Sequence, residues 1–269
     1  MTPPVDDPDD PRLADYRNIP DPELLRAHGL FVAEGRLVVR RLLADGRFRT
    51  RSVMATEAAH AAIAGALAAR PDVAVFVVPP AVMNGVTGFN IHRGCLAIGE
   101  RPAATPWADV AAGARRLVAL ERVANADNVG GTFRNAAAFG ADGVLLDPAT
   151  VDPLYRKAIR TSMGAALVVP FARAEPWPAA LGALAARGVA TIALTPGASA
   201  PPLAEVAAQA ASRARPVALV LGHEGDGLAA ETVGLCTHRA RIPIAPGVDS
   251  LNVATAAAVA LYELGRQGV

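Results

Sequence analysis

From Arg115 onward, short and almost continuous apolar runs alternate with stretches of helical pattern, and this alternation constrains the fold more than any other feature. The apolar runs are RLVALE, GVLL, ALVVPF, VATIALT, PVALVLG and RARIPI, and we expect helices at 129–139, 153–161, 177–187, 228–236 and 251–266. Strands that are apolar along their whole length are typical of parallel sheets covered by helices on both faces. The alternation therefore predicts an α/β domain over 115–269 with a mainly parallel sheet.

The residues before this domain divide into three segments. Residues 1–20 are acidic and rich in proline, which predicts a flexible or loosely packed arm. Residues 21–100 have a compact α/β pattern, in which the strand-like runs RSVMAT and VAVFVVP flank the helical run EAAHAAIAGALAAR. Residues 101–114 are rich in proline and alanine and predict a linker between this small domain and the larger one.

The composition limits the class of protein. Hydrophobic residues make up 52% of the chain and charged residues 19%, which supports a packed core. The net charge is only +1, so contact with a nucleic acid would need a local basic patch. The N-terminus does not have the pattern of a signal peptide, and the apolar runs are too short to span a membrane. Two cysteines outside any metal motif fit a reducing compartment. We therefore expect a cytoplasmic protein with no membrane partner and no metal site.

Ligands of open α/β sheets bind at the carboxyl ends of the strands, where the strand-to-helix turns lie. Asn128 follows the strand RLVALE and is a predicted N-cap of the next helix. Arg134 lies at the edge of the face formed by Val129, Phe133 and Ala136, from which its guanidinium could reach a cleft. An ordinary surface arginine is an equally good interpretation of this spacing alone.

Three further turns carry unusual residues. After VATIALT, which ends at Thr195, Pro196 and Gly197 predict a tight turn. The run LGHEGDGL begins at Leu221, and its glycines allow the backbone to approach a ligand, although it matches neither a Walker loop nor the dinucleotide fingerprint. His223 in this run is a possible general base or a solvated loop residue. Before the last helix, any of Asp249, Ser250 and Asn252 could be the N-cap, although one cap is sufficient.

Taken in order, these stretches resemble the SpoU-type, TrmH-like branch of the SPOUT RNA methyltransferases. The first motif is matched by Asn128 and Arg134, the second by Gly222, Glu224 and Gly227, and the third by Ile242-Pro243-Ile244 and Ser250-Leu251-Asn252-Val253. The run KAIRTSMGAALVVP over 157–170 is similar to the family's intervening segment. The resemblance covers about 115–266, and His223 and Ala254 stand where other residues are common. The runs LFVAEGRLVVRRLL and NIHRGCLAIGE resemble a ribosomal-protein-like RNA-binding domain that precedes the catalytic domain in the family.

The resemblance implies a deep trefoil knot in the C-terminal domain, a homodimer formed through that domain, and S-adenosylmethionine as cofactor. The implied cofactor-binding residues are Thr195, Leu221, Gly222, Gly227, Ile242, Ile244 and Leu251. The implied reaction is methyl transfer to a ribose 2′-hydroxyl of tRNA or rRNA. In it Arg134 acts as a base or orients the hydroxyl, and the residues that position Arg134 and the ribose are Asn128, Glu224, Ser250 and Asn252.

Alternatives remain at this point. A SPOUT fold could bind RNA without catalysis, as a ribosome-assembly factor, and a nucleotide-binding hydrolase or dehydrogenase is disfavoured because its fingerprints are missing. Within the family, an antibiotic-resistance enzyme acting on rRNA is not separated from an enzyme of housekeeping modification. Several arginines could contact RNA phosphates, or could simply be solvated charges: Arg36, Arg40, Arg41, Arg93, Arg156 and Arg160.

Overall fold

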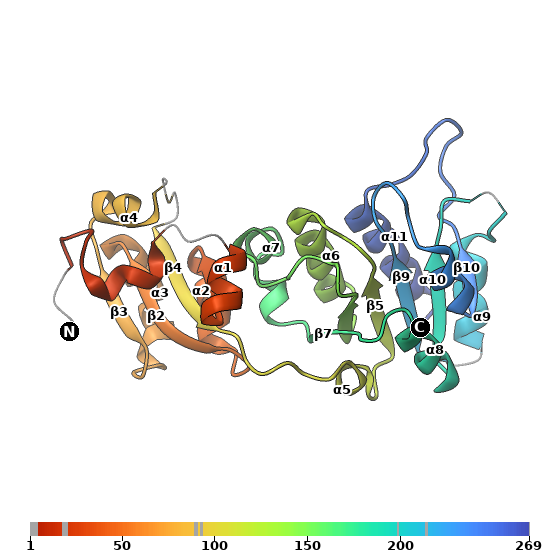
Figure 1. The fold of residues 1–269 in the computed structure, drawn as a ribbon, viewed down its shortest axis with the longest axis horizontal. Helices are drawn as coiled ribbons and strands as arrows, with labels where there is room; N and C mark the ends of the chain where they lie inside the picture. Colours follow the sequence, from red (N-terminus) through yellow and green to blue (C-terminus); the bar gives the residue numbers. More distant parts are fainter. Residues whose placement is uncertain are drawn as a thin grey trace. The chain divides into compact units, whose positions relative to one another are not determined.

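The computed structural model describes residues 5–17, 21–88, 91, 94–197, 199–212 and 215–268. The chain forms two compact units, which Figure 1 shows as a ribbon. The first unit contains residues 1–103 together with 153–168, and the second contains 104–152 and 169–269. The boundary at 103 falls within the predicted linker, in which Trp107–Ala111 form the short helix α5. Residues 153–168 group with the first unit, although the sequence pattern places them in the second.

The first unit is built on a four-stranded sheet in the order β1-β4-β2-β3. The pairs β1–β4 and β4–β2 are antiparallel, and β2–β3 is parallel. The strands are β1 (Leu30–Glu34), β2 (Arg49–Ala55), β3 (Ala74–Val77) and β4 (Cys95–Glu100). The helices of this unit are α1 (Asp21–His28), α2 (Arg36–Ala44), α3 (Glu57–Ala68), α4 (Pro80–Thr87) and α7 (Arg156–Thr161). The α/β pattern predicted over 21–100 is therefore confirmed element by element for the runs quoted above.

The N-terminal arm is packed, in contrast to the prediction. Residues Pro11–Tyr16 form the 3-10 helix η1, and Val5, Leu13 and Tyr16 are buried in the core of the first unit. The Tyr16 hydroxyl lies 2.8 Å from the hydroxyl of Ser52 on β2. The expectation of a loosely packed arm over 1–20 is thus wrong for residues 5–17, while 1–4 and 18–20 lie outside the described residues. A few apolar side chains cover the sheet, and the intervening aspartates and prolines hide this pattern in the sequence.

The second unit is built on a six-stranded sheet in the order β10-β8-β9-β5-β6-β7, with every pair parallel. The strands are β5 (Arg116–Leu120), β6 (Gly143–Leu146), β7 (Phe171–Arg173), β8 (Ala190–Leu194), β9 (Val217–Leu221) and β10 (His238–Ala240). The helices are α6 (Ala126–Ala138), α8 (Ala179–Ala186), α9 (Leu203–Ser212), α10 (Ala230–Leu235) and α11 (Val253–Arg266). The predicted parallel α/β domain is confirmed. None of the described helices is long and apolar enough to cross a membrane.

Three elements of this half of the chain differ from the prediction. The run ALVVPF was expected to be a strand, but Ala165–Leu167 form the 3-10 helix η2 and the strand starts at Phe171, since a short apolar run does not distinguish helix from strand. Of the expected strand RARIPI, only Arg239 and Ala240 belong to β10, and Arg241 forms an isolated bridge with Pro202. Helix α9 was not predicted, because its buried face combines Leu203 and Val206 with alanines that are too small to mark a stripe.

Candidate active site

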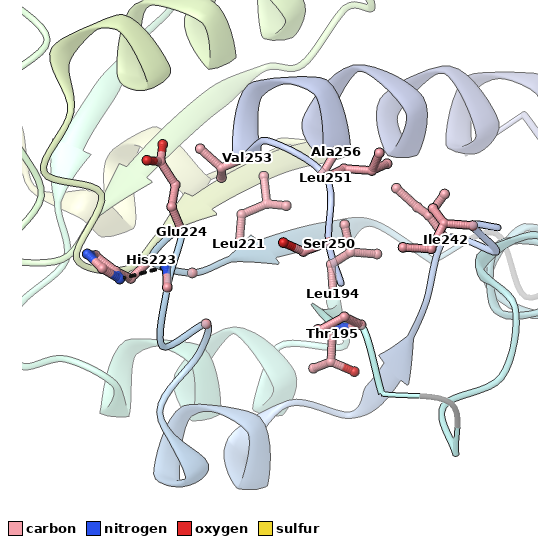
Figure 2. A pocket seen from close by; sticks show the side chains of 15 residues that line it. Leu194, Thr195, Leu221, His223, Glu224, Ile242, Ser250, Leu251, Val253 and Ala256 are labelled. Carbon is pink, nitrogen blue, oxygen red and sulfur yellow. Dashed lines mark hydrogen bonds between the residues drawn. The ribbon is translucent and has the colours of Figure 1, made fainter. Parts of the chain in front are cut away.

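A cavity opens at the carboxyl ends of β8 and β9, with about 690 Å³ of space between atoms, including the part open to solvent. Three chain segments line it, at 194–196, 221–227 and 242–256, and Figure 2 shows their side chains converging. The lining residues include every predicted cofactor-binding residue: Thr195, Leu221, Gly222, Gly227, Ile242, Ile244 and Leu251. Residues that the sequence prediction did not assign to the cofactor site also line it: Leu194, Pro196, His223, Gly225, Val253 and Ala256. Most of these are direct neighbours of predicted residues.

The loop after β9 folds back on itself. A Cβ atom at Gly222 would lie 2.5 Å from the backbone nitrogen of Leu228, so only glycine allows this close return of the chain. Gly227 has a φ of +67°, in the left-handed region that favours glycine, and its N–H donates to the carbonyl of His223 at 3.0 Å. The glycines were expected to let the backbone come close to a ligand. In the structure, Gly222 lets one part of the loop come close to another, and the loop forms one wall of the cavity.

The side chains of His223 and Glu224 differ in their surroundings. The Nδ1 atom of His223 accepts from the N–H groups of Gly225 and Asp226, at 3.0 and 3.3 Å. This lone pair is occupied by the loop backbone, so the Nδ1 atom is not available as a general base. Glu224 is exposed, and in Figure 2 its carboxylate points in a different direction from the His223 ring.

A buried carboxylate anchors the far end of this loop. Glu121, immediately after β5, is 2% exposed. It accepts from the indole N–H of Trp177 at 2.9 Å, from the N–H of Ala229 at 2.8 Å and from the hydroxyl of Thr232. Glu121 therefore holds the start of α10 against the strand ends, because a buried carboxylate is stable only when its oxygens are paired. A charged residue directly after a continuous apolar strand was the available clue, and the sequence prediction missed it.

The next residue, Arg122, also reaches the loop. Its Nη2 atom donates to the carbonyl of Gly227 at 3.3 Å, and its Nη1 atom lies 3.8 Å from a carboxylate oxygen of Asp226. The Arg122 backbone has a φ of +54°, and its N–H donates to the buried carboxylate of Asp147. Glu121 and Arg122 together tie the glycine loop to the end of β5.

The polar residues before α11 have separate tasks. The Oδ1 atom of Asn252 accepts from the N–H groups of Ala254 and Thr255 at 3.0 and 3.2 Å, so Asn252 is the N-cap. Its Nδ2 atom donates to the Oδ1 atom of Asn128 at 2.8 Å. Ser250 does not cap the helix and lines the cavity instead.

Helix α6 begins earlier than expected. Its N-cap is Asn125, whose side chain accepts from the N–H of Asp127 at 2.9 Å. The prediction of Asn128 as N-cap is therefore wrong, because the run NADN offers two asparagines with the same preference. Asn128 lies inside the helix and is 6% exposed, so its side chain is available to Asn252.

Helices α6 and α11 approach each other closely beside this pair. A Cβ atom at Gly131 would lie 2.8 Å from the Cβ atom of Ala254. The Asn135 side chain donates to the carbonyl of Ala254 at 2.7 Å. The small side chains and the two amide contacts fix α6 against the beginning of α11, and thus against the cavity wall at 251–256.

The predicted catalytic residues fall into three places. Glu224 and Ser250 line the cavity, and Asn128 pairs with Asn252 between the helices. Arg134 is exposed on α6, does not line the cavity, and has no polar partner among the residues that the structure describes. Its five N–H donors are therefore open to a ligand.

The two cysteines are poor nucleophiles. Burial raises the pKa of the Cys236 thiol to about 11 and that of Cys95 to about 12. Both thiols are therefore protonated near neutral pH, and neither offers a thiolate to a substrate.

Comparisons with known proteins agree with this geometry. The model of the SpoU rRNA Methylase family matches residues 115–262, more than half of the chain. A protein of Mycobacterium tuberculosis H37Rv named as an uncharacterized tRNA/rRNA methyltransferase is 43% identical over 268 residues, which cover 98% of this chain and 92% of that protein. The AdoMet-bound rRNA methyltransferase of Sinorhizobium meliloti is 27% identical with a TM-score of 0.83, over 99% of this chain and 98% of that one.

A further likeness concerns the fold alone. The SpoU methyltransferase AviRb of Streptomyces viridochromogenes, in complex with AdoMet, is 21% identical and has a TM-score of 0.76, over 96% of each chain. The family match, the relative at 43% identity and these shared architectures agree with one another. The chain therefore belongs to the SpoU rRNA Methylase family of RNA methyltransferases.

Proposed function

We propose that this RNA methyltransferase uses S-adenosylmethionine to methylate a ribose 2′-hydroxyl of tRNA or rRNA. The observation that carries the proposal is the cavity itself. Three segments far apart in the sequence bring every predicted cofactor-binding residue, together with Glu224 and Ser250, around one opening at the strand ends. This is the edge of a parallel sheet where ligands bind.

The lining fits a nucleoside-containing cofactor. Aliphatic side chains supply contacts for the faces of a purine ring, and they come from Leu194, Leu221, Ile242, Ile244, Leu251 and Val253. Polar groups are few: the hydroxyls of Thr195 and Ser250, the Glu224 carboxylate, the His223 imidazole and the loop backbone. An apolar pocket of several hundred Å³ with a small number of polar groups is typical of cofactor sites. When bound, S-adenosylmethionine supplies an electrophilic methyl group on its sulfonium.

The residues of the chain must prepare the nucleophile. A ribose hydroxyl is hardly ionised at neutral pH, so its proton must be taken up or its orientation controlled. A guanidinium stays protonated and is a poor base, whereas it binds phosphate oxygens through charged hydrogen bonds. We therefore assign Arg134 the role of holding an RNA phosphate and orienting the hydroxyl.

The packing of α6 supports this assignment. Arg134 stands on the same helix as Asn128 and Asn135, whose side chains bond to Asn252 and to the carbonyl of Ala254. These bonds tie the helix that carries Arg134 to the cavity wall. In this proposal Asn128 and Asn252 act as positioning residues, and Glu224 and Ser250 contact the ribose.

The proposal includes the trefoil knot and a homodimer. Two of the three segments that line the cavity, 221–227 and 242–256, are those that the resemblance assigns to the knot. On α11, Val259 and Tyr262 are 40% and 55% exposed, and the Tyr262 ring meets Phe139 edge-to-face, with ring centroids 6.2 Å apart. This exposed apolar surface of α11, beside Phe139 at the end of α6, supports a homodimer formed through the second unit.

A methyl-transfer assay tests the function. Purified protein, labelled S-adenosylmethionine and total RNA from a strain that lacks the gene are mixed, and the label is mapped to a nucleotide. We expect label at a single 2′-O-methylated ribose, which makes the following phosphodiester bond resistant to alkali. Label on a base would overturn the 2′-hydroxyl assignment. RNA binding with neither cofactor binding nor label would favour the non-catalytic assembly factor.

The variant Arg134→Ala tests the assigned role. We expect transfer to fall by about 100-fold or more, because an oriented charged donor contributes of that order to catalysis. Binding of S-adenosylmethionine should be unchanged, since Arg134 does not line the cavity. Arg187→Ala, at another exposed arginine of the same unit, is the control and should keep normal turnover. If Arg134→Ala also keeps normal turnover, Arg134 does not orient the ribose hydroxyl and the assigned role is wrong.

A further inference from the structure

His223 is a polar residue of the cavity to which the function proposed above gives no task. It lies in the loop between β9 and α10, directly after Gly222, and it is half-buried. Its backbone pairs with Gly227 through an isolated antiparallel bridge, which closes the loop. The residue also stands where other residues are common in the family, so the family match does not account for it.

The loop backbone fixes the His223 ring. Its Nδ1 atom accepts from the N–H groups of Gly225 and Asp226, at 3.0 and 3.3 Å. The ring also packs against Gly225, where an added Cβ atom would lie 3.4 Å from Cε1 of His223. A nitrogen that accepts two N–H groups keeps its lone pair, so the neutral ring carries its hydrogen on Nε2. The loop therefore determines both the orientation of the ring and the place of its one donor.

The Nε2–H group of His223 has no hydrogen-bond partner among the residues that the structure describes. Other acceptors of the loop are already engaged. The carbonyl of Gly227 accepts from Arg122 at 3.3 Å, and the carboxylate of Asp226 lies 3.8 Å from Nη1 of the same arginine. The carbonyl of His223 itself accepts from the N–H of Gly227 at 3.0 Å. The Nε2–H group is thus a fixed donor that is open to a ligand.

The direction of the ring separates this donor from the apolar part of the cavity. In Figure 2 the His223 ring points away from Leu221 and Ser250. The next residue, Glu224, carries an exposed carboxylate, which is an acceptor. A donor and an acceptor therefore stand on consecutive residues of one loop, outside the aliphatic lining that suits a purine ring. A nucleotide offers the matching groups, because its ribose and phosphate oxygens accept and its hydroxyls donate.

We propose that His223 binds the acceptor nucleotide of the RNA, by donating its Nε2–H to a ribose or phosphate oxygen. These oxygens are present in every nucleotide, so the contact orients the nucleotide and does not select its base. The inference rests on the proposed function, because the acceptor nucleotide is the one whose 2′-hydroxyl is methylated. His223 acts here as a substrate-binding residue and transfers no proton.

Two substitutions separate the donor from the acceptor of the ring. In His223→Asn, the new Oδ1 atom is as many bonds from the backbone as Nδ1 is, whereas the Nε2–H group is lost. Asparagine commonly accepts from N–H groups two and three positions further on, as Asn252 does from Ala254 and Thr255. This variant therefore keeps the loop closed, while His223→Ala removes both the acceptor and the donor. His28→Asn, at an exposed histidine at the end of α1, is the control for the substitution itself.

The test measures cofactor and RNA separately in the full chain. Calorimetry gives the Kd of S-adenosylmethionine, and turnover gives kcat and KM for an RNA fragment that carries the methylated nucleotide. The affinity for tRNA and for rRNA is measured without cofactor, so that a contact is detected even where no methyl group is transferred. A urea midpoint near that of the wild type checks that each variant is folded.

We expect His223→Asn to lower kcat/KM for the RNA by about three- to tenfold, as for the loss of one neutral hydrogen bond. Its Kd for S-adenosylmethionine should be unchanged. His223→Ala should show the same loss for RNA and should also bind the cofactor about threefold or more weakly, because the loop that forms the cavity wall loses its inner acceptor. The control should behave like the wild type in both measurements.

The possible failures can be told apart. If His223→Asn keeps the kcat/KM of the wild type, the Nε2–H group contacts no substrate, and the inference is wrong while the proposed function stands. If His223→Asn weakens cofactor binding as much as His223→Ala does, the donor serves the cofactor and its assignment to RNA is wrong. If the wild type binds RNA more tightly than His223→Asn but transfers no methyl group, the proposed function fails and the contact remains. If the wild type neither binds nor methylates RNA, both proposals fail.

Discussion

At the scale of single residues, the segment before α11 shows how neighbouring polar side chains separate structural and functional work. Asn252 bonds to two N–H groups of α11 and to Asn128 on α6. Ser250, two positions earlier, is exposed and faces the cavity. Substitutions at these two positions should therefore differ in kind.

We expect Asn252→Ala to lower the free energy of unfolding by about 2 to 3 kcal/mol. Loss of the cap costs about 1 kcal/mol, and the buried Asn128 amide loses its partner at a further cost of about 1 to 2 kcal/mol. Ser250→Ala should stay within about 0.5 kcal/mol of the wild type, as for an exposed side chain outside the core. Urea denaturation measures both. Equal destabilisation by the two variants would contradict this division of tasks.

At this scale, every residue that the resemblance assigns to the cofactor lines one cavity. Their contact with the cofactor stays a prediction. Glu121 and Arg122 were missed, since their importance depends on contacts with Ala229 and Gly227, more than a hundred positions away. The role of Arg134 stays a prediction, because an exposed guanidinium shows its partner only when RNA is bound.

At the scale of elements, the close approach of α6 and α11 depends on a glycine facing an alanine. We expect a coupling of about 1 kcal/mol between Gly131→Ala and Ala254→Gly. The added methyl group at 131 overlaps the Cβ atom of Ala254, and removal of that atom relieves the overlap. Denaturation of both single variants and the double variant measures the coupling.

A matched control lies in another helix. Gly65→Ala in α3 has open space at its Cβ position, and it should stabilise by up to about 1 kcal/mol through helix propensity alone. If Gly131→Ala raises the free energy of unfolding as much as Gly65→Ala does, both with Ala254 and in the Ala254→Gly background, then the close contact between α6 and α11 does not affect stability.

Element types were largely predictable, because hydrophobic periodicity is a local property of the sequence. The parallel sheet of the second unit and the α/β pattern of the first both followed from apolar runs and their spacing, whereas the mixed strand directions of the first sheet were not predicted. The elements that differ are short or alanine-rich. In α9 and in the run before β7, small or brief apolar stretches satisfy helix and strand patterns equally well.

At the scale of the whole molecule, the cofactor cavity and both tryptophans, Trp107 and Trp177, belong to the second unit. We expect S-adenosylmethionine at 100 times its Kd to stabilise that unit by about 2.7 kcal/mol, and the unfolding midpoint measured by tryptophan fluorescence to rise. Amide hydrogen exchange of β2 in the first unit is the internal control and should not slow. If exchange in β2 slows while the tryptophan midpoint does not shift, the cofactor binds the first unit, and the assignment of the cavity in the second unit is wrong.

The sequence by itself determined the types of most elements, the parallel character of the second sheet, the residues around the cavity and the family. These properties depend on local periodicity and on residue types in a fixed order. Only the tertiary structure decided which asparagine caps each helix, that residues 5–17 pack on the first sheet, and that 153–168 join the first unit. These outcomes depend on contacts such as Asn128 with Asn252 and Asp21 with Arg156, across 124 and 135 positions of the chain. No local pattern encodes such pairs, because each side chain has several acceptable partners until the packing of the core selects one.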